Sequence, residues 1–206
     1  MKILINGYQG KMGTILRETH QDCEKLDLRN EVMPEGDVII DFSNKKALSG
    51  ILEFALERNI PLVLCTTGYT EEDLEKIKKA SLKVPILLSY NTSIGINLIV
   101  VMLEKMPMLR DFDIEIIDIH HNKKKDAPSG TGVMLKNAIG VDNVTIHSLR
   151  AGNIVGEHKI IFSKDDETIE ITHKAGSRKI FANGAIAAAK FLIGKKPDLY
   201  KITDLW

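Results

Sequence analysis

The stretch KILINGYQGKMG, residues 2–13, decides the fold class of this chain. Its apolar start, residues 2–6, has the composition of a buried β-strand, and its end begins a helical pattern. Gly7 permits a tight turn out of the strand, Gly10 lets a pyrophosphate approach the backbone, and Gly13 lets the helix pack close to the sheet. The stretch therefore predicts a strand, a phosphate-binding loop and a helix in direct succession.

Short apolar runs and longer helical patterns continue to alternate through the first half of the chain. We predict further strands at residues 37–42, 61–65 and 84–89, and helices at residues 11–20, 45–58 and 71–80. This alternation is typical of a parallel sheet covered by helices on both faces. The same sequence could also form a glycine-containing turn that binds no ligand. The position of the glycines between the first strand and the first helix favours nucleotide binding, because helix amides there point at phosphates.

The pattern changes after residue 93. We predict a long helix at residues 94–109, a helix within residues 129–140, and strands at residues 112–120, 144–150, 158–163 and 167–174. Few helices separate these strands, which indicates a mixed or antiparallel sheet. The fold class is therefore α/β: an N-terminal Rossmann-like, doubly wound parallel sheet, then a C-terminal α+β domain built on a mixed sheet. A last apolar helix, residues 178–194, fits either half.

Charge and composition exclude several classes of function. Lys+Arg and Asp+Glu are equal at 28 each, so the chain has no overall basic field to hold nucleic acid or an anionic membrane. We expect no membrane span, because no run of about 18 apolar residues occurs, and no apolar export segment follows the N-terminus. The two cysteines, Cys23 and Cys65, form neither a disulfide framework nor a spaced metal site, so we predict a reduced, cytoplasmic protein.

The local charge is concentrated in IHHNKKKDAPSG, residues 119–130. His120 and His121 end a predicted strand, in which successive side chains point to opposite faces, so the two cannot easily chelate one metal ion. A third ligand at motif spacing is missing from the sequence, and we predict no metal site. We assign Lys123 and Lys125 to a solvated surface.

The end of the same stretch has the chemistry of an anion site. Lys124 precedes a Pro-Ser-Gly-Thr sequence that opens the next predicted helix. Ser129 or Thr131 can cap that helix, which leaves its positive end to receive a carboxylate. Lysine and histidine donors would add charge-assisted hydrogen bonds. A small dicarboxylate fits this arrangement better than a neutral substrate.

Seven motifs together closely resemble those of the dihydrodipicolinate reductase (4-hydroxy-tetrahydrodipicolinate reductase) family. They are GYQGKMG, DVIIDFS, CTTGYT, YNTSIGIN, HHNKKKDAPSGT, SLRAGNIVGEH and ITHKAGSRKIFANGA. The motifs stand in the family's order from residue 5 to about residue 185, and the HHNKKKDAPSGT block is the most specific of them. The resemblance therefore covers nearly the whole chain.

The resemblance implies a fold and a reaction. It implies a dinucleotide-binding domain at residues 1–93, to which residues 183–206 return, and a substrate-binding and oligomerisation domain at residues 94–182 of a homotetramer. The implied enzyme is an oxidoreductase of diaminopimelate and lysine biosynthesis. It reduces 4-hydroxy-tetrahydrodipicolinate to tetrahydrodipicolinate with NADH or NADPH, without a metal, and delivers hydride to ring C4.

The resemblance also implies roles for individual residues. His120 would be the acid/base residue, and Lys124 a proton donor that also contacts substrate. The substrate-binding residues would be His121, Lys124, Ser129, Gly130 and Thr131. The cofactor-binding residues would be Gly7, Tyr8, Gln9, Gly10, Lys11, Met12, Cys65, Thr66, Thr67, Ser89, Tyr90, Asn91 and Thr92. A histidine, whose unperturbed pKa is about 6.5, suits proton transfer near neutral pH.

Departures from the family pattern lie on the cofactor side. The family usually has Gly-Thr-Thr where this chain has Cys-Thr-Thr from Cys65, and often Asn-Phe-Ser where this chain has Thr92 in the middle. The region between the first helix and the second strong strand is also shortened. There, Glu31 would favour a free ribose hydroxyl and Arg29 could receive a 2′-phosphate, so NADH and NADPH both remain open. Cys65 is interpreted as a small buried residue rather than a reactive thiol.

Other interpretations remain beside this one. Arg150 and His158 in SLRAGNIVGEH could contact a ligand, but a glycine-rich connection between strands explains the pattern as well, and we leave both outside the predicted site. A dehydrogenase of amino acids or aldehydes is the nearest enzymatic alternative. A nucleotide-binding regulator without catalysis is another, and the retention of His120 and Lys124 weighs against it.

Overall fold

The computed structural model describes residues 1–30 and 33–206. The chain divides into two compact units: Met1–Ser93 together with Lys179–Trp206, and Ile94–Arg178. The last segment thus joins the first unit from Lys179, whereas the sequence analysis put its return at residue 183. Within the described part of the chain, none of the helices has the length and apolarity to cross a membrane.

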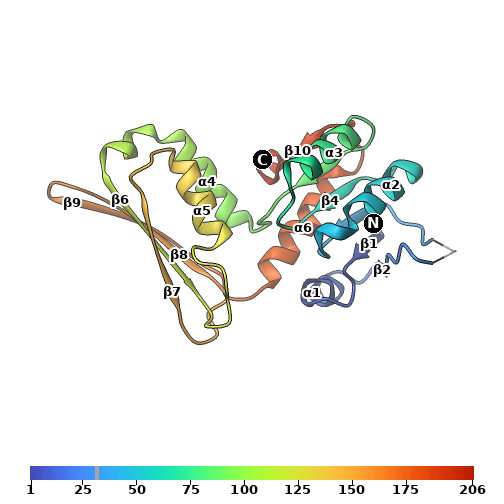
Figure 1. Cartoon of the computed structure of the whole chain (residues 1–206), viewed down its shortest axis with the longest axis horizontal. Helices are drawn as coiled ribbons and strands as arrows, with labels where there is room; N and C mark the ends of the chain where they lie inside the picture. Colours follow the sequence, from blue (N-terminus) through green and yellow to red (C-terminus); the bar gives the residue numbers. More distant parts are fainter. Residues whose placement is uncertain (31–32) are drawn as a thin grey trace. The chain divides into compact units, whose positions relative to one another are not determined.

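The first unit is built on a parallel sheet of six strands (Figure 1). The strands are β1 (Ile3–Asn6), β2 (Cys23–Lys25), β3 (Val38–Asp41), β4 (Leu62–Leu64), β5 (Ile86–Leu88) and β10 (Leu199–Tyr200). Their order is β10-β5-β4-β3-β1-β2, with all neighbours parallel. The chain order reverses at β1, which pairs with β2 on one side and β3 on the other. Ligands of such sheets bind outside the carboxyl ends of the strands at this switch point.

Helices cover both faces of this sheet. They are α1 (Lys11–Thr19), α2 (Leu48–Arg58), α3 (Glu71–Ser81) and α6 (Lys179–Leu192). Ile3 and Ile5 of β1 share a core with residues of α1 and α6, whereas Leu4 shares the opposite core with residues of α2 and α3. This alternation follows from the period of two in a strand, and each fully buried side chain of this kind contributes about 1.5–3 kcal/mol. The predicted doubly wound sheet is confirmed.

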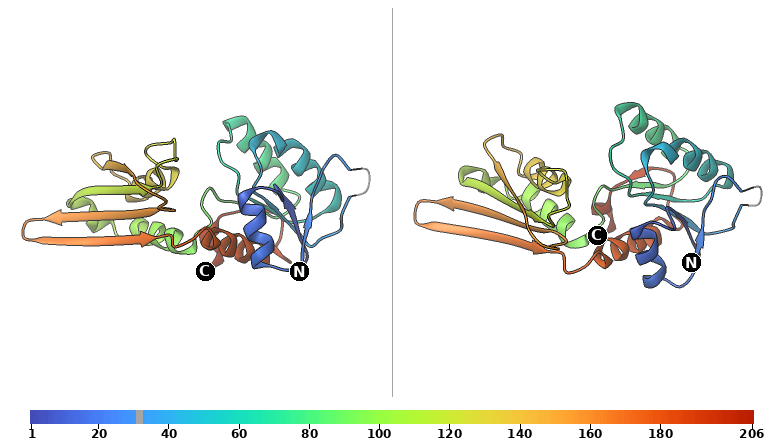
Figure 2. Two further views of the ribbon diagram at one scale, coloured as in Figure 1. Left: turned by 90° about the horizontal axis from the view of Figure 1, so that it is seen from below. Right: turned by 60° about the horizontal axis from the view of Figure 1, so that its bottom comes forward.

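The second unit is built on a mixed sheet of four strands. They are β6 (Asp113–His120), β7 (Thr145–Arg150), β8 (Glu157–Lys164) and β9 (Glu167–Lys174). The order is β7-β6-β8-β9; β7 runs parallel to β6, while β8 and β9 run antiparallel to their neighbours. Helices α4 (Ile94–Lys105) and α5 (Gly130–Ile139) pack side by side against one face, and the β8–β9 hairpin forms the long orange ribbon in Figure 2.

Two predicted helices differ from the observed ones in detail. The helix predicted at residues 94–109 ends at Lys105, and a 3-10 turn, η2 (Pro107–Asp111), follows it. Proline lacks an amide and its ring clashes with the preceding helical turn, so the α-helix cannot run through Pro107. The helix predicted from residue 45 starts as a 3-10 turn, η1 (Lys45–Ala47), before α2. Another short 3-10 turn, η3 (Ile202–Leu205), lies near the C-terminus.

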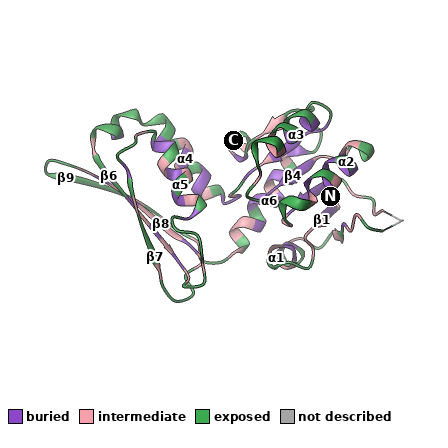
Figure 3. Ribbon diagram, viewed as in Figure 1, coloured by how far each residue is buried: buried purple, intermediate pink, exposed green. Residues whose placement is uncertain are grey.

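Burial alternates along β6, one of the strands coloured by burial in Figure 3. Ile114 and Ile116 are buried on the face that α4 and α5 cover, and Asp118 and His120 continue the same alternation. Because strand side chains alternate between faces, these four belong to one face of the sheet. The apolar core of the second unit therefore ends in a carboxylate and an imidazole.

Candidate functional site

Strand pairing brings further polar residues to the end of this face. In the register of the sheet, Asp118 lies opposite His158 of β8 and Ser148 of β7, and His120 lies opposite Arg150. Asp118 is fully buried, and His120 and His158 are nearly so. Four polar side chains from three neighbouring strands therefore surround one carboxylate.

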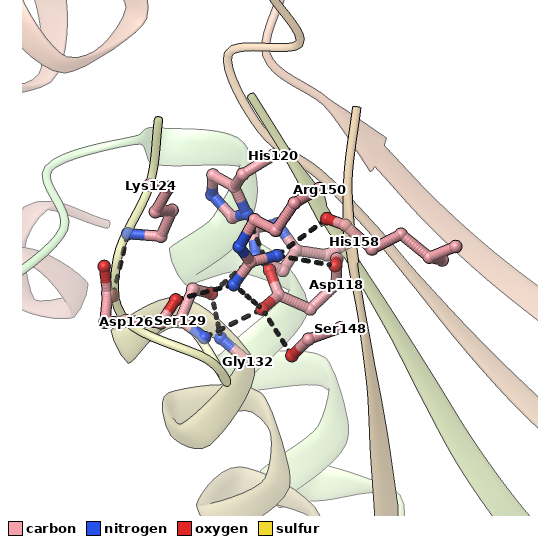
Figure 4. A network of polar contacts seen from close by, with 10 residues as sticks. Asp118, His120, Lys124, Asp126, Ser129, Gly132, Ser148, Arg150 and His158 are labelled. Atoms are coloured by element: carbon pink, nitrogen blue, oxygen red, sulfur yellow. Dashed lines mark hydrogen bonds and ion pairs between the residues drawn. The ribbon is translucent and has the colours of Figure 1, made fainter. Parts of the chain in front are cut away.

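The Asp118 carboxylate is the centre of these contacts (Figure 4). Its Oδ1 lies 2.7 Å from Nδ1 of His120 and 3.4 Å from Nε2 of His158. Its Oδ2 accepts hydrogen bonds from the backbone amide of Ser129 at 2.8 Å and from Nη2 of Arg150 at 3.2 Å. The rings of His120 and His158 meet edge to face, with their centroids 5.2 Å apart.

These contacts set the charge of Asp118. Burial alone would raise the pKa of this carboxyl, because it penalises the charged form. The neighbouring His120 and His158 and the amide of Ser129 outweigh burial, and they hold the pKa of Asp118 well below its ordinary value. These contacts therefore favour the charged carboxylate form of Asp118.

Ser129 starts helix α5 beside this carboxylate. Its side chain accepts a hydrogen bond from the amide of Gly132 at 3.1 Å, as an N-cap residue does, and its Oγ lies 3.2 Å from Nε2 of His158. Of the two predicted caps, Ser129 is the one that the structure shows. Gly130 and Thr131 form the first turn of α5, where the helix dipole is positive. The helix start can receive an anion.

Lys124 lies on the loop between β6 and α5. Its Nζ is 2.8 Å from Oδ2 of Asp126, and this lysine is the main reason why the pKa of Asp126 is lowered. The backbone carbonyl of Asp126 accepts a hydrogen bond of 2.7 Å from Nη2 of Arg150. Lys123 and Lys125 are exposed, whereas Lys124 is half-buried. The three consecutive lysines therefore have different surroundings.

Three groups of the cluster also have the chemistry of metal ligands. One ligand atom each from Asp118, His120 and His158 lie within 4.8 Å of one another. The Asp118 carboxylate, however, is already paired with the permanent cation of Arg150, and a dication would have to share it against that charge. The electrostatics of the cluster therefore favour protons over a metal ion.

Part of this cluster was not among the predicted site residues. Arg150 and His158 were left outside the predicted site, and the structure places both in contact with the carboxylate beside His120. Asp118 was not singled out. The signal was present in FDIEIIDIH, where Asp118 and His120 stand two positions apart and so share a face. The partners from β7 and β8 could not be assigned, because the sequence does not specify the strand register.

The glycine loop of the first unit has the geometry that its sequence predicts. Gly7 has a φ of +86°, and a Cβ there would lie 2.8 Å from the carbonyl oxygen of Phe42. A Cβ on Gly13 would overlap the carbonyl oxygen of Gly7, so α1 packs against the loop at backbone distance. The Gly10 amide donates to the Gly7 carbonyl at 2.9 Å and closes the turn. Tyr8 packs under Arg17, whose guanidinium lies 4.4 Å from the ring centroid.

A hollow of about 480 Å³ lies beside this loop at the carboxyl ends of β1 and β2. It is lined by Asn6, Gly7, Tyr8, Gln9, Gly10, Lys25, Leu26, Asp27, Leu28, Arg29, Lys46, Ala47 and Gly50. Lys11 and Met12 follow the loop as the first residues of α1. The predicted phosphate-binding residues thus adjoin a cavity at the switch point of the sheet, where nucleotides bind in such folds.

One acidic residue of this hollow was not among the predicted site residues. Asp27 follows β2, and its carboxylate lies 2.8 Å from Nη2 of Arg29 and 2.9 Å from Nζ of Lys25. Hydrogen bonds from Arg29 and then from Lys25 hold the pKa of Asp27 well below its ordinary value. The end of β2 was uncertain in the sequence, which is why the prediction named Arg29 and Glu31 instead. Glu31 lies outside the described residues.

The residues after β4 are tied to a buried carboxylate. Asp41, at the end of β3, accepts hydrogen bonds from Nδ2 of Asn6 and from Oγ1 of Thr66, both at 2.8 Å. The ends of β1, β3 and β4 are thereby joined. Burial raises the pKa of the Cys65 thiol well above its usual range, as expected of an unreactive buried cysteine. Thr67 is exposed.

The segment after β5 has both buried and exposed members. Thr92 is buried, and its hydroxyl donates to the carbonyl of Phe181 in α6 at 2.7 Å, so this departure from the family pattern has a structural use. The Ser89 hydroxyl donates to the Asn91 carbonyl at 2.8 Å. The Tyr90 ring is half-exposed and available to a ligand.

Sequence comparison adds to this geometry. A family model described as "Dihydrodipicolinate reductase, N-terminus" matches residues 27–92, and one described as "Dihydrodipicolinate reductase, C-terminus" matches residues 95–206. The chain belongs to the dihydrodipicolinate reductase family. The family recognised from the motifs is confirmed.

Two relatives show the extent of the similarity. The 4-hydroxy-tetrahydrodipicolinate reductase of Brachyspira hyodysenteriae is 47% identical over 233 residues, which cover 100% of this chain and 99% of the relative. The reductase of the same name from Thermosipho africanus is 43% identical over 214 residues, with 100% and 97% covered. The relatives are oxidoreductases, which confirms the predicted enzyme class.

Solved structures share the fold. The dipicolinate-bound dihydrodipicolinate reductase of Paenisporosarcina sp. TG-14 is similar with a TM-score of 0.80 at 21% identity, over 98% of this chain and 97% of that one. An amine dehydrogenase of Mycobacterium smegmatis is similar with a TM-score of 0.65 at 8% identity, and the similarity covers 98% of this chain and 95% of that one. The predicted α/β fold class is confirmed.

Proposed function

We propose that this chain catalyses the NAD(P)H-dependent reduction of 4-hydroxy-tetrahydrodipicolinate to tetrahydrodipicolinate, a step of diaminopimelate and lysine biosynthesis. The observation that carries this proposal is the juxtaposition of His120, the Lys124 loop and the positive start of α5 around one buried carboxylate. Relatives that bear the name of this reductase match the whole chain, which supports the same assignment.

The substrate site is suited to a small dicarboxylate. The amides at Gly130 and Thr131 lie at the start of a capped helix, where each charge–dipole contact stabilises an anion by about 0.3–1 kcal/mol. Lys124 adds an ammonium group, and His121 lies at the start of the same loop. The related Paenisporosarcina reductase has dipicolinate bound, a ring with two carboxylates. We assign one substrate carboxylate to the helix start and to Lys124.

The first unit fits a dinucleotide. A side chain at Gly7 or Gly13 would collide with neighbouring backbone, so the tight turn and the close packing of α1 that shape this loop depend on glycine. The backbone of the loop and of Lys11 and Met12 would hold the phosphates at the N-terminus of α1. Residues Cys65–Thr67 and 89–92 would line the nicotinamide side of the cofactor. When bound, the reduced nicotinamide supplies the hydride that reaches ring C4.

The hollow at the end of β2 supports the use of both cofactors. The Asp27 carboxylate has the position and chemistry to accept hydrogen bonds from the hydroxyls of the adenosine ribose. Arg29, Lys25 and Lys46 line the same hollow and can face a 2′-phosphate. Because Arg29 already pairs with Asp27, one movement of its side chain would release the carboxylate to a ribose or carry the guanidinium to a phosphate.

His120 and Lys124 are the groups that we assign to proton transfer. Loss of the substrate hydroxyl as water leaves a conjugated ring, and hydride addition puts negative charge into it. His120 as an imidazolium ion would deliver the proton that quenches this charge, since an acid works best when its pKa lies near the operating pH. Lys124 would stabilise the developing charge as an ammonium ion, and it is the alternative donor of that single proton. We assign no metal to these steps.

The active form is proposed to be a cytoplasmic homotetramer. The face of the mixed sheet opposite α4 and α5 carries half-buried apolar residues such as Ile117, Ile119 and Ile161, and Leu149 is half-exposed beside them. Contacts between such faces of several copies would bury these side chains, and apolar burial is the main driving force of association.

Isotope transfer tests the reaction. The substrate would be made in place from pyruvate and aspartate semialdehyde by a separate synthase, with NADH or NADPH that carries deuterium at the transferable position. We expect the ring product to gain a single mass unit in the presence of this chain, with the label at ring C4. An unlabelled product, or no synthase-dependent product at all, would exclude the proposed hydride transfer.

A further inference from the structure

The buried ion pair between Asp118 and Arg150 reaches both proposed acid groups. On one side, Asp118 Oδ1 lies 2.7 Å from Nδ1 of His120. On the other side, Arg150 Nη2 donates to Asp118 Oδ2 at 3.2 Å and to the carbonyl oxygen of Asp126 at 2.7 Å. Asp126 in turn pairs with Lys124. A single chain of contacts therefore runs from His120 to Lys124.

The planar guanidinium of Arg150 suits this connection. Its Nη1 donates to the backbone carbonyls of Asp118 at 3.2 Å and of Leu149 at 2.7 Å, which fixes the plane of the group between β6 and β7. Its Nη2 then bridges the carboxylate and the loop. A lysine would carry the same charge but could not keep this fork of donors.

The orientation of His120 follows from the same pair. Because Nδ1 faces Asp118, Nε2 is the ring nitrogen that remains for a ligand. A Cβ on Gly156 would lie 3.1 Å from that Nε2, so the glycine leaves room beside it. Nδ1 of His120 therefore faces the Asp118 carboxylate, and Nε2 has space beside Gly156.

We propose that Asp118 and Arg150 are a positioning pair for the proposed reduction: Asp118 orients His120 and stabilises its protonated form, and Arg150 holds the loop that carries Lys124. The inference rests on the proposed function, because it assigns His120 the role of the acid. It adds two residues that act through others and touch neither substrate nor cofactor.

The charged and titratable groups around His120 come from β6, β7, β8 and the loop after β6. Asp118 from β6 is the anion, and Arg150 from β7 and His158 from β8 are the cationic or titratable neighbours. His158 lies opposite His173 of β9, whose pKa is lowered by burial and then by His158. Lys124 and Asp126 come from the loop as a pair of opposite charge. Removal of the charge of Asp118 would leave the cations uncompensated, which disfavours an imidazolium at His120.

The test compares Asp118→Asn and Arg150→Lys with the parent in the coupled reductase assay over a range of pH. Asp113→Asn, the same change at an exposed position of β6, is the matched control. We expect Asp118→Asn to lower kcat at least about tenfold and to move the alkaline limb of its pH profile down by about one unit or more. Arg150→Lys should lower kcat/KM, while the alkaline limb of its pH profile stays at the same pH as in the parent. Asp113→Asn should resemble the parent.

The outcomes separate this inference from the proposed function. An active parent with an unmoved alkaline limb in Asp118→Asn would overturn the positioning role, whereas the reductase assignment would stand. Inactivity of the parent with both cofactors would overturn the reductase assignment.

A second measurement does not depend on whether the Asp118→Asn variant folds. Nitrogen-15 NMR of histidine-labelled parent protein, with the His120 signals identified by their loss in His120→Gln, reports which ring nitrogen carries the proton in the neutral form. The Nδ1–H tautomer is expected, and the Nε2–H tautomer would overturn the inference.

Discussion

Three consecutive lysines with different environments give the clearest contrast between single residues. Lys124 is half-buried and paired with Asp126, whereas Lys123 and Lys125 are exposed. Composition cannot distinguish the three. The sequence analysis separated them by the spacing of Lys124 from His120 and by resemblance to the family, and the burial observed here agrees with that separation.

We predict that Lys124→Ala and Lys125→Ala differ strongly in activity. Loss of the Lys124 ammonium removes a charge-assisted contact with a substrate carboxylate, which is worth about 1.5–3 kcal/mol. The value of kcat/KM should therefore fall roughly 10- to 100-fold in Lys124→Ala and stay near the parent value in Lys125→Ala. Steady-state kinetics with the synthase-coupled substrate would show this. Equal losses in the two variants would mean that a general positive field, and not Lys124 itself, binds the substrate.

Cofactor preference is also decided by single residues. Arg29→Gln would remove the cation that can face a 2′-phosphate, so we expect a KM for NADPH at least about tenfold higher and little change with NADH. Asp27→Asn should impair NADH more than NADPH, because it weakens the acceptor for the ribose hydroxyls. Initial rates with each cofactor would be compared, with Arg58→Gln, a change in α2 of the same unit, as the control. A proportional loss with both cofactors in each variant would contradict the assignment.

At the scale of elements, the sequence was a good guide where patterns are local. Strands and helices were predicted within a few residues, because apolar periodicity and glycine loops are local signals. Pro107 ended a helix that its apolar pattern would have prolonged. Strand β10 has two residues, too few for a period, and it was missed. The contacts of Asp118 were missed for another reason: they depend on pairing between strands that are far apart in the sequence.

Helix capping links an element to the site and can be tested. Ser129 caps α5 in the second unit, and Thr70 caps α3 in the first unit with a full capping box. Alanine at either position should cost about 1 kcal/mol of unfolding free energy in its own unit. Only Ser129→Ala should also weaken the binding of dipicolinate, because α5 is the proposed anion site.

Denaturant unfolding and calorimetric titration with dipicolinate would measure the two effects of capping. If Thr70→Ala weakened dipicolinate binding as much as Ser129→Ala, the loss would reflect general stability and the assignment of α5 would be wrong.

At the scale of the whole molecule, the fold class and the two-unit organisation could be predicted, and the join of the last segment could not be derived from pattern alone. Helix α6 is apolar enough to be buried in either unit, and the residues alone left its place open. The structure shows it packed against β3 and β4 in the core of the first unit. Such a return depends on contacts between distant parts of the chain, which a local pattern does not encode.

Assembly is the remaining prediction at this scale. Ile117→Lys places a charge on the apolar face of the mixed sheet, and we expect it to dissociate the proposed tetramer. Ile193→Lys, at an exposed isoleucine of the first unit, is the control and should leave the assembly intact. Sedimentation velocity over a range of protein concentrations would give the masses. A parent chain that sediments as a monomer at all concentrations would rule the tetramer out.

The measurement that tests the central claim most directly is a coupled assay of the parent chain. A separate synthase would condense pyruvate with aspartate semialdehyde, and NADH and NADPH oxidation would be followed in parallel, with His120→Ala and Lys124→Ala beside the parent. We predict synthase-dependent oxidation that both substitutions largely abolish. No oxidation with either cofactor, in a folded chain that still binds one of them, would contradict the account and leave a nucleotide-binding protein without reductase activity.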